Sequence, residues 1–290
     1  MTRNILLGLF AVPLAGCAST WDTVSNRQFQ SDFANNPYKA MFVSDDPMTV
    51  LRTNPDGSAR AKAMRRMEEP ATHGHPEEQA EALQYLSDAA TIETSPVVRA
   101  AAIEALGKFK DPNVLPILKA AYAQSSGNKS VEQAMQRTMN PAAPGLLSDR
   151  SGLFGPTGYP PEVVVLLKSR TIEAMARTGQ PEAYAFIADI AKTQEDPKNP
   201  NIIDRDVRLA AVKSLSQIRT SESATLLAQV MMTESNRDTA IANRAREGLV
   251  ELTGHNYPVG STEWNGVMQA GFTVRPEPNL IERAVGWLTP

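Results

Sequence analysis

Two stretches of this sequence carry the same hydrophobic pattern and align with each other without a gap. The first runs from Val98 to Tyr122 and the second from Val207 to Met231, so the copies lie 109 residues apart. In each copy, apolar residues recur at the three- and four-residue spacing of a helix, pause at a short turn, and resume. This pattern predicts a pair of helices joined by a tight turn. Its recurrence predicts a chain built from several such pairs.

One apolar residue serves as an anchor in each copy of the pattern: Met67, Leu106, Met175, Leu215 and Leu249. The steps between successive anchors are 39, 69, 40 and 34 residues. Repeats of 34 to 40 residues with two antiparallel helices are typical of an α-solenoid, because one pair cannot bury its apolar face without stacking on its neighbours. We therefore expect an all-α fold, a superhelix of helix pairs over residues 56–256, with Leu106 and Leu215 at equivalent core positions.

The repeated sequence resembles HEAT-like repeats, most clearly from Val98 to Gly107 and from Asp204 to Leu215. In HEAT-like repeats a basic residue near the start of one helix bonds to an acidic or carbonyl group of the adjoining repeat. The residues in that register are Arg60, Arg99, Lys168 and Arg208. The resemblance implies that they form a structural ladder in a domain used for binding. Asp56 and Asp204 each precede an arginine by four residues, a spacing that favours a helical ion pair.

The 69-residue step interrupts the period with an irregular insertion near residues 123–162. Its second half, residues 141–161, is rich in glycine and proline, which do not form a helix. It carries five apolar side chains, which are the candidate partner-binding residues: Leu146, Leu147, Leu153, Phe154 and Tyr159. Such side chains either fold back on the solenoid or bind a partner. Three interpretations of the loop at 140–161 stay open: a lid, a degenerate repeat or a binding site.

The first residues have the layout of a secretory signal peptide, which would occupy residues 1–16. Arg3 precedes a short apolar run that is not long enough to cross a hydrocarbon core of roughly 30 Å as a helix. The run closes with Leu14-Ala15-Gly16-Cys17, which resembles the bacterial lipobox, where signal peptidase cuts before a cysteine that then takes lipid. The resemblance implies a lipid anchor on Cys17 in the cell envelope, facing the periplasm. Ala18, where an Asp would mark inner-membrane retention, favours the outer membrane.

Two less regular segments flank the repeats. Residues 17–55 are predicted to be a lipid-anchored leash, because polar residues dominate and no helical period survives beyond a short turn near 45–51. Residues 257–290 are predicted to be a capping tail, in which aromatic residues such as Tyr257 and Trp264 cover the exposed final helix.

The composition offers no sign of catalytic chemistry. A formal charge of -3 and a pI near 5.8 show no excess of basic residues of the kind that binds nucleic acid. His73 and His75 form the one close histidine pair, and metal binding would need further ligands that the spacing does not supply. The adjacent Glu68 and Glu69 are interpreted as a solvated helix end. We therefore expect no metal, no cofactor and no enzyme activity.

The sequence predicts a membrane-anchored lipoprotein of the cell envelope that acts as a protein-interaction scaffold through its HEAT-like repeats. Its expected partners are the membrane, through the lipid, and an unidentified envelope protein. Two alternatives use the loop at 140–161 differently: a periplasmic enzyme, and a protein that binds an envelope polymer.

Overall fold

The computed structural model describes residues 46–53, 56–126, 158–193 and 204–276. Within these ranges the regular structure is helical and there is no strand, which confirms the predicted all-α fold. The chain divides into two compact units, Met1–Thr49 and Val50–Pro290, and the second unit contains the repeats. Cys17, the predicted site of a lipid anchor, and most of the predicted leash lie outside the described residues.

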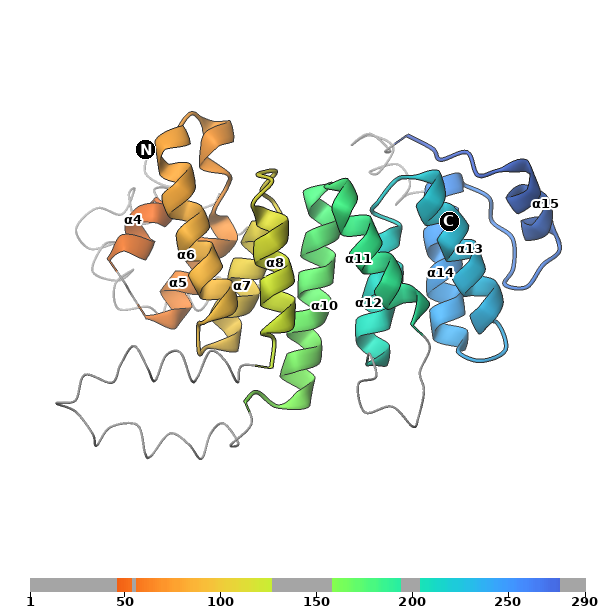
Figure 1. The fold of residues 1–290 in the computed structure, drawn as a ribbon, viewed down its shortest axis with the longest axis horizontal. Helices are drawn as coiled ribbons and strands as arrows, with labels where there is room; N and C mark the ends of the chain where they lie inside the picture. Colours follow the sequence, from red (N-terminus) through yellow and green to blue (C-terminus); the bar gives the residue numbers. More distant parts are fainter. Residues whose placement is uncertain (1–45, 54–55, 127–157, 194–203, 277–290) are drawn as a thin grey trace, which may run out of the picture. The chain divides into compact units, whose positions relative to one another are not determined.

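The helices of the second unit come in pairs, which Figure 1 shows in chain order. The pairs are α5 (Gly57–Arg66) with α6 (Gln79–Thr91), α7 (Pro96–Leu106) with α8 (Val114–Ala123), α10 (Pro161–Thr178) with α11 (Pro181–Lys192), and α12 (Arg205–Leu215) with α13 (Ser221–Glu234). They are preceded by α4 (Pro47–Arg52) and followed by α14 (Thr239–Thr253) and α15 (Glu263–Ala270). Two short 3-10 turns, η1 (Pro70–His73) and η2 (Pro76–Glu78), connect α5 to α6.

Capping residues explain where these helices begin. Pro96, Pro161 and Pro181 each open a helix, where a missing N–H and a fixed φ are tolerated. Asp56 and Asp204 cap α5 and α12 by accepting hydrogen bonds from backbone N–H groups in the first turn. The predicted ion pairs of these aspartates with the arginines four residues later are wrong, because the carboxylates cap the helices and the arginines pair with Glu93 and Glu234 instead.

The first helices of the pairs form a continuous stack. The first helices of successive pairs contact one another in the order α5, α7, α10, α12 and α14. Each second helix packs against the first helix of the next pair: α6 on α7, α8 on α10, α11 on α12, and α13 on α14. The five predicted anchors, from Met67 to Leu249, are all buried in the resulting core. This arrangement is the predicted HEAT-like solenoid.

The long step in the repeat period leaves the stack continuous. Helix α10 contacts both α7 and α8, so no further helix pair stands between the second pair and the third. The approach of α7 to α10 is close, because a Cβ built on Gly107 would lie 2.9 Å from the Cα of Ala174. A glycine at this position therefore lets the two backbones meet.

The last repeat is covered by an irregular segment and α15. Trp264 is fully buried, and its indole N–H donates to the carbonyl of Pro258 at 3.1 Å. Tyr257 packs edge-on against that indole with ring centroids 5.3 Å apart. Arg219 of the α12–α13 turn donates to the carbonyl of Arg275 at 2.7 Å, which ties the end of this segment to the repeats. The two aromatic residues named for a cap thus pack on each other beyond the last long helix.

Candidate interaction surface

A fully buried arginine joins two successive repeats. Arg99 lies near the start of α7 and has no solvent exposure. Its Nε donates to the carbonyl of Ala90, in the last turn of α6, at 3.1 Å, and its Nη2 donates to the carbonyl of Gln124, at the end of α8, at 2.9 Å. The last carbonyls of a helix have no intrahelical partner. The guanidinium therefore satisfies the ends of the second helices on either side of α7.

The same geometry recurs two pairs later. The Nε of Arg208 donates to the carbonyl of Ala191 at 3.0 Å, and its Nη2 pairs with the buried carboxylate of Glu234 at 2.7 Å. Arg60 of α5 pairs with Glu93, just past the end of α6, at 2.8 Å. Its Nε has no hydrogen-bond partner among the described residues, as expected for the first pair of the stack. The predicted ladder is confirmed at these arginines.

Lys168 departs from the ladder. Its ammonium lies 5.4 Å from the ring centre of Tyr122, a residue of the preceding repeat, in a cation–π contact. Tyr122 in turn meets Phe186 of α11 edge-on at 5.2 Å, and burial raises the pKa of its hydroxyl. A basic residue at this position still joins neighbouring repeats, but it does so through an aromatic ring.

Glu69 corrects one of the sequence-based interpretations. It is buried instead of solvated, and its carboxylate accepts backbone N–H bonds from Lys110 at 2.8 Å and Asp111 at 3.0 Å. Gln79 of α6 donates a third bond at 3.0 Å. Glu69 thereby fixes the turn between α7 and α8 to the connection between α5 and α6. Its neighbour Glu68 is exposed and pairs with His73 at 2.9 Å.

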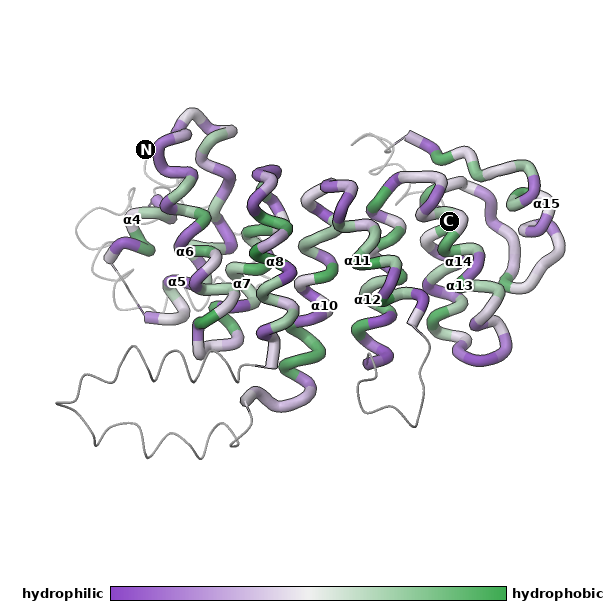
Figure 2. Tube along the Cα trace, in the orientation of Figure 1, coloured by the Kyte–Doolittle hydropathy of each residue, from purple (hydrophilic) through white to green (hydrophobic). Residues whose placement is uncertain are grey.

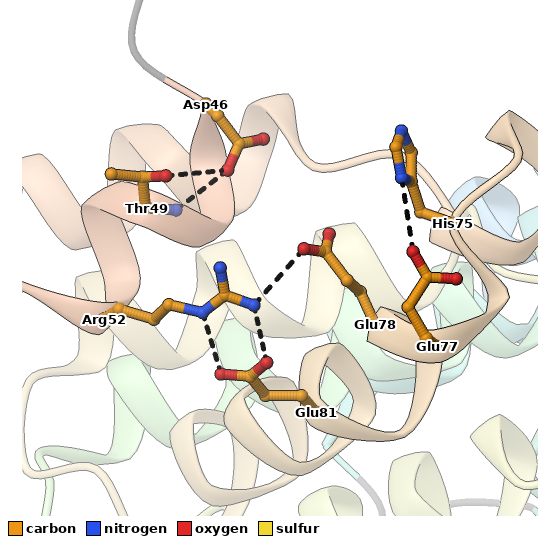
Figure 3. Close-up of polar contacts among 7 residues, drawn as sticks. All are labelled: Asp46, Thr49, Arg52, His75, Glu77, Glu78 and Glu81. Atoms are coloured by element: carbon orange, nitrogen blue, oxygen red, sulfur yellow. Dashed lines mark hydrogen bonds and ion pairs between the residues drawn. The ribbon is translucent and has the colours of Figure 1, made fainter.

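The charged groups near the histidines form an exposed ionic network. Arg52 of α4 pairs with Glu81 at 2.7 Å and with Glu78 at 3.3 Å (Figure 3). The hydrogen bond from Arg52 lowers the pKa of Glu81. His75 faces Glu77 at 3.6 Å and stays largely exposed. Over the described residues, no group of three or more His, Cys, Asp and Glu side chains gathers as a metal site would require.

Charged pairs link neighbouring first helices along their outer face. Arg65 of α5 lies 3.6 Å from Glu104 of α7, and Lys213 of α12 lies 2.9 Å from Glu173 of α10. These side chains are at equivalent positions, two residues before the anchors. Exposed pairs of this kind contribute little to stability, about 0–1 kcal/mol each. The face is therefore a polar surface that carries charges of both signs.

Two exposed apolar side chains interrupt this polar face. Val97 of α7 is 55% exposed and Leu166 of α10 is 49% exposed, and both stand nine residues before their anchors. At the same position the other first helices carry small or polar residues: Ser58, Asp206 and Ala240. Val163, one turn before Leu166, is half-buried. The apolar start of α10 is visible in Figure 2.

Tyr159 is the one candidate loop residue whose place the structure describes. It is buried, and its hydroxyl lies 2.9 Å from the carbonyl oxygen of Glu93 and 2.8 Å from that of Thr94. Its ring lies under the guanidinium of Arg99 at 5.5 Å, and burial raises its pKa. At this residue the insertion folds back on the repeats. The remaining candidates lie outside the described residues: Leu146, Leu147, Leu153 and Phe154.

Two polar hollows open on the surface of the described repeats. One lies between α11 and α13, where Tyr184, Lys192 and Glu222 line it, and the other lies between α12 and α14, beside Lys213 and Glu247. Each holds a serine hydroxyl beside a glutamate carboxylate: Ser221 lies 3.4 Å from Glu222, and Ser216 lies 2.9 Å from Glu251. In the described part of the chain, no helix combines the length and the hydropathy needed to cross a bilayer.

Comparison with known proteins agrees with this architecture. Residues 45–139 match the HEAT repeats family, which covers α4 to α8. No curated protein and no solved structure gives a match. The stack of helix pairs continues beyond the matched residues to α14, and Arg208 of α12 repeats the buried arginine of α7. The protein is thus an all-α, HEAT-like solenoid, an architecture that indicates a protein-interaction scaffold.

Proposed function

We propose that this protein is a lipid-anchored interaction scaffold of the cell envelope, held in a membrane through Cys17 and facing the periplasm. Two features support the anchor: the sequence Leu14-Ala15-Gly16-Cys17 after a short apolar run, and a polar segment between it and the repeats. A tether with two or more acyl chains gives stable anchoring, since each buried methylene contributes about 0.8 kcal/mol. Ala18 favours the outer membrane for this anchor.

The stacked repeats carry the scaffold part of the proposal. Their apolar side chains and buried arginines are used on neighbouring repeats, as Arg99 and Arg208 show. This leaves an outer face with charges of both signs and polar hollows. Such a surface suits recognition of another macromolecule over a large area better than the enclosure of a small substrate. Binding by the solenoid is therefore the function that this geometry supports best.

The anchor is tested by the substitution Cys17→Ser, with Ser19→Ala as the matched control two residues away. Cells fed a labelled fatty acid should label the wild type and the control, and both should sediment with membranes. The Cys17→Ser variant should take up no label and leave the membrane fraction. An unlabelled wild type, or label that persists in Cys17→Ser, would show that the lipid anchor has been assigned wrongly.

A further inference from the structure

The aromatic side chains of the repeat helices are confined to the second helix of a pair. The first helices α5, α7, α10, α12 and α14 contain none, whereas Tyr85 lies in α6, Tyr122 in α8, and Tyr184 and Phe186 in α11. All four are half-buried, so they do not belong to the core that the anchors form. Aromatic residues are enriched in protein–protein interfaces. The second helices therefore carry the side chains that such interfaces favour.

Four side chains from three helices form a connected cluster between the second pair and the third. The ammonium of Lys168 in α10 lies 5.4 Å from the ring centre of Tyr122, and the rings of Tyr122 and Phe186 meet edge-on at 5.2 Å. The ammonium of Lys119 in α8 lies 6.0 Å from the ring centre of Phe186. Cation–π attraction holds each ammonium near its ring. We call these four residues the lysine–aromatic cluster.

The two ammonium groups keep their hydrogen-bonding capacity for a partner. Each has three N–H donors, and within the described residues neither Lys119 nor Lys168 forms a hydrogen bond or an ion pair. Glu182 and Asp189 are exposed on the same helix as Phe186, yet their carboxylates pair with neither lysine. The basic side chains that join neighbouring first helices, by contrast, are each paired with a glutamate. The cluster thus offers two positive charges that have no carboxylate partner in the described structure.

Helix α11 separates the cluster from a second recess. Phe186 faces α8, whereas Tyr184 faces α13, where its hydroxyl donates to the carbonyl of Glu222 at 3.3 Å. Tyr184 and Lys192 line the hollow between α11 and α13. A partner that covers α11 therefore meets an aromatic ring and a lysine on both sides of this helix.

We propose that the lysine–aromatic cluster binds an acidic segment of the partner protein. Carboxylates of the segment pair with the ammonium groups of Lys119 and Lys168, and its apolar side-chain atoms pack on Tyr122 and Phe186. Charge complementarity selects an acidic occupant, and an extended segment can bring separate carboxylates to both ends of the row of rings. The inference rests on the proposed scaffold function, because it names the surface and the charge of the partner that the scaffold binds.

A labelled acidic peptide tests the chemistry of this surface. Fluorescence anisotropy with the full-length protein should show saturable binding of a fluorescein-labelled oligoglutamate peptide and no binding of an oligoserine peptide. The double variant Lys119→Gln/Lys168→Gln should bind oligoglutamate on the order of tenfold more weakly, as expected for the loss of two charge pairs. Lys62→Gln/Lys213→Gln removes the same charge from the first helices and should bind like the wild type. No saturable binding by the wild type, or equal loss in both double variants, would overturn the proposal.

Crosslinking in cells separates this inference from the scaffold function itself. A photo-reactive phenylalanine analogue would replace Ala185, exposed on α11, or Asn243, exposed on α14. The probe at 185 should form an adduct with an acidic segment of another protein, and Lys119→Gln/Lys168→Gln should abolish it. An adduct at 185 with lipid, with this same chain or with a segment that is not acidic would overturn the inference. Protein adducts from the probe at 243 alone would overturn it and leave the scaffold function standing, whereas no protein adduct from either probe would contradict both.

Discussion

The stability of a buried arginine depends on the oxygen atoms that accept its hydrogen bonds. Arg99 has no solvent exposure, and it donates hydrogen bonds to the carbonyls of Ala90 and Gln124, which lie at the ends of two different helices. Arg99→Ala should therefore leave two buried carbonyls unsatisfied and open a cavity, which destabilises the fold by about 3–5 kcal/mol. Denaturant unfolding measures this loss. Arg65→Ala, which removes an exposed arginine of α5, should change the stability by less than about 0.5 kcal/mol. Equal effects at both positions would contradict the structural role of the ladder.

A capping aspartate makes a prediction about pH. Asp238 accepts two bonds from Arg205 and caps α14, and the Arg205 guanidinium holds its pKa well below the usual range. Because the folded state depresses this pKa, the stabilisation is present above the unfolded value of about 3.9 and is lost as the pH falls towards the folded one. Asp238→Asn keeps a good cap but removes the charge. The wild type should be more stable than the variant at pH 7, by up to about 1 kcal/mol, with a smaller gap at pH 3. A gap that grows as the pH falls would contradict this account.

At the scale of helices, the closest approach in the stack gives a test with a matched control. Gly107 ends α7 in ordinary helical geometry, so alanine would suit its backbone, but an added Cβ would meet the backbone of Ala174 at 2.9 Å. Gly107→Ala should push α7 from α10 and destabilise the protein by about 1–3 kcal/mol. Gly266 in α15 has open space around it, so Gly266→Ala should be neutral or stabilise by about 0.5–1 kcal/mol. Thermal unfolding of both variants measures this, and a stabilised Gly107→Ala variant would contradict the close packing.

The helices could be predicted because the residues that begin and end them are visible in the local sequence. Pro96, Pro161 and Pro181 open three of them, and Gly179 and Gly254 close two in the left-handed conformation. The register was equally accessible, since apolar anchors that recur at steps of 34 to 40 residues, with one step of 69, must face the shared core. The role of Glu69 was not accessible, because its partners Lys110 and Asp111 are brought to it only when two repeats stack.

At the scale of the whole molecule, the sequence predicted the stacked repeats but not which apolar side chains lie on their surface. In the sequence, Val97 and Leu166 look like ordinary apolar residues of a buried helix face. The structure shows that both side chains are exposed on stacked helices. Aligning the repeats would have given a signal, because Ser58 and Asp206 occupy the same register. Tyr159 was named among the partner-binding candidates, whereas its burial against Glu93 and Thr94 required coordinates.

The central claim is that a HEAT-like solenoid tethered to the envelope membrane binds another protein. The most direct test is crosslinking in living cells, followed by purification of the full-length wild type and of Cys17→Ser at equal expression and equal melting temperature. The account predicts a defined protein partner at near-stoichiometric yield with the wild type, and a clear loss of that partner with Cys17→Ser. Recovery of no stoichiometric partner, or equal recovery with both chains, would contradict it.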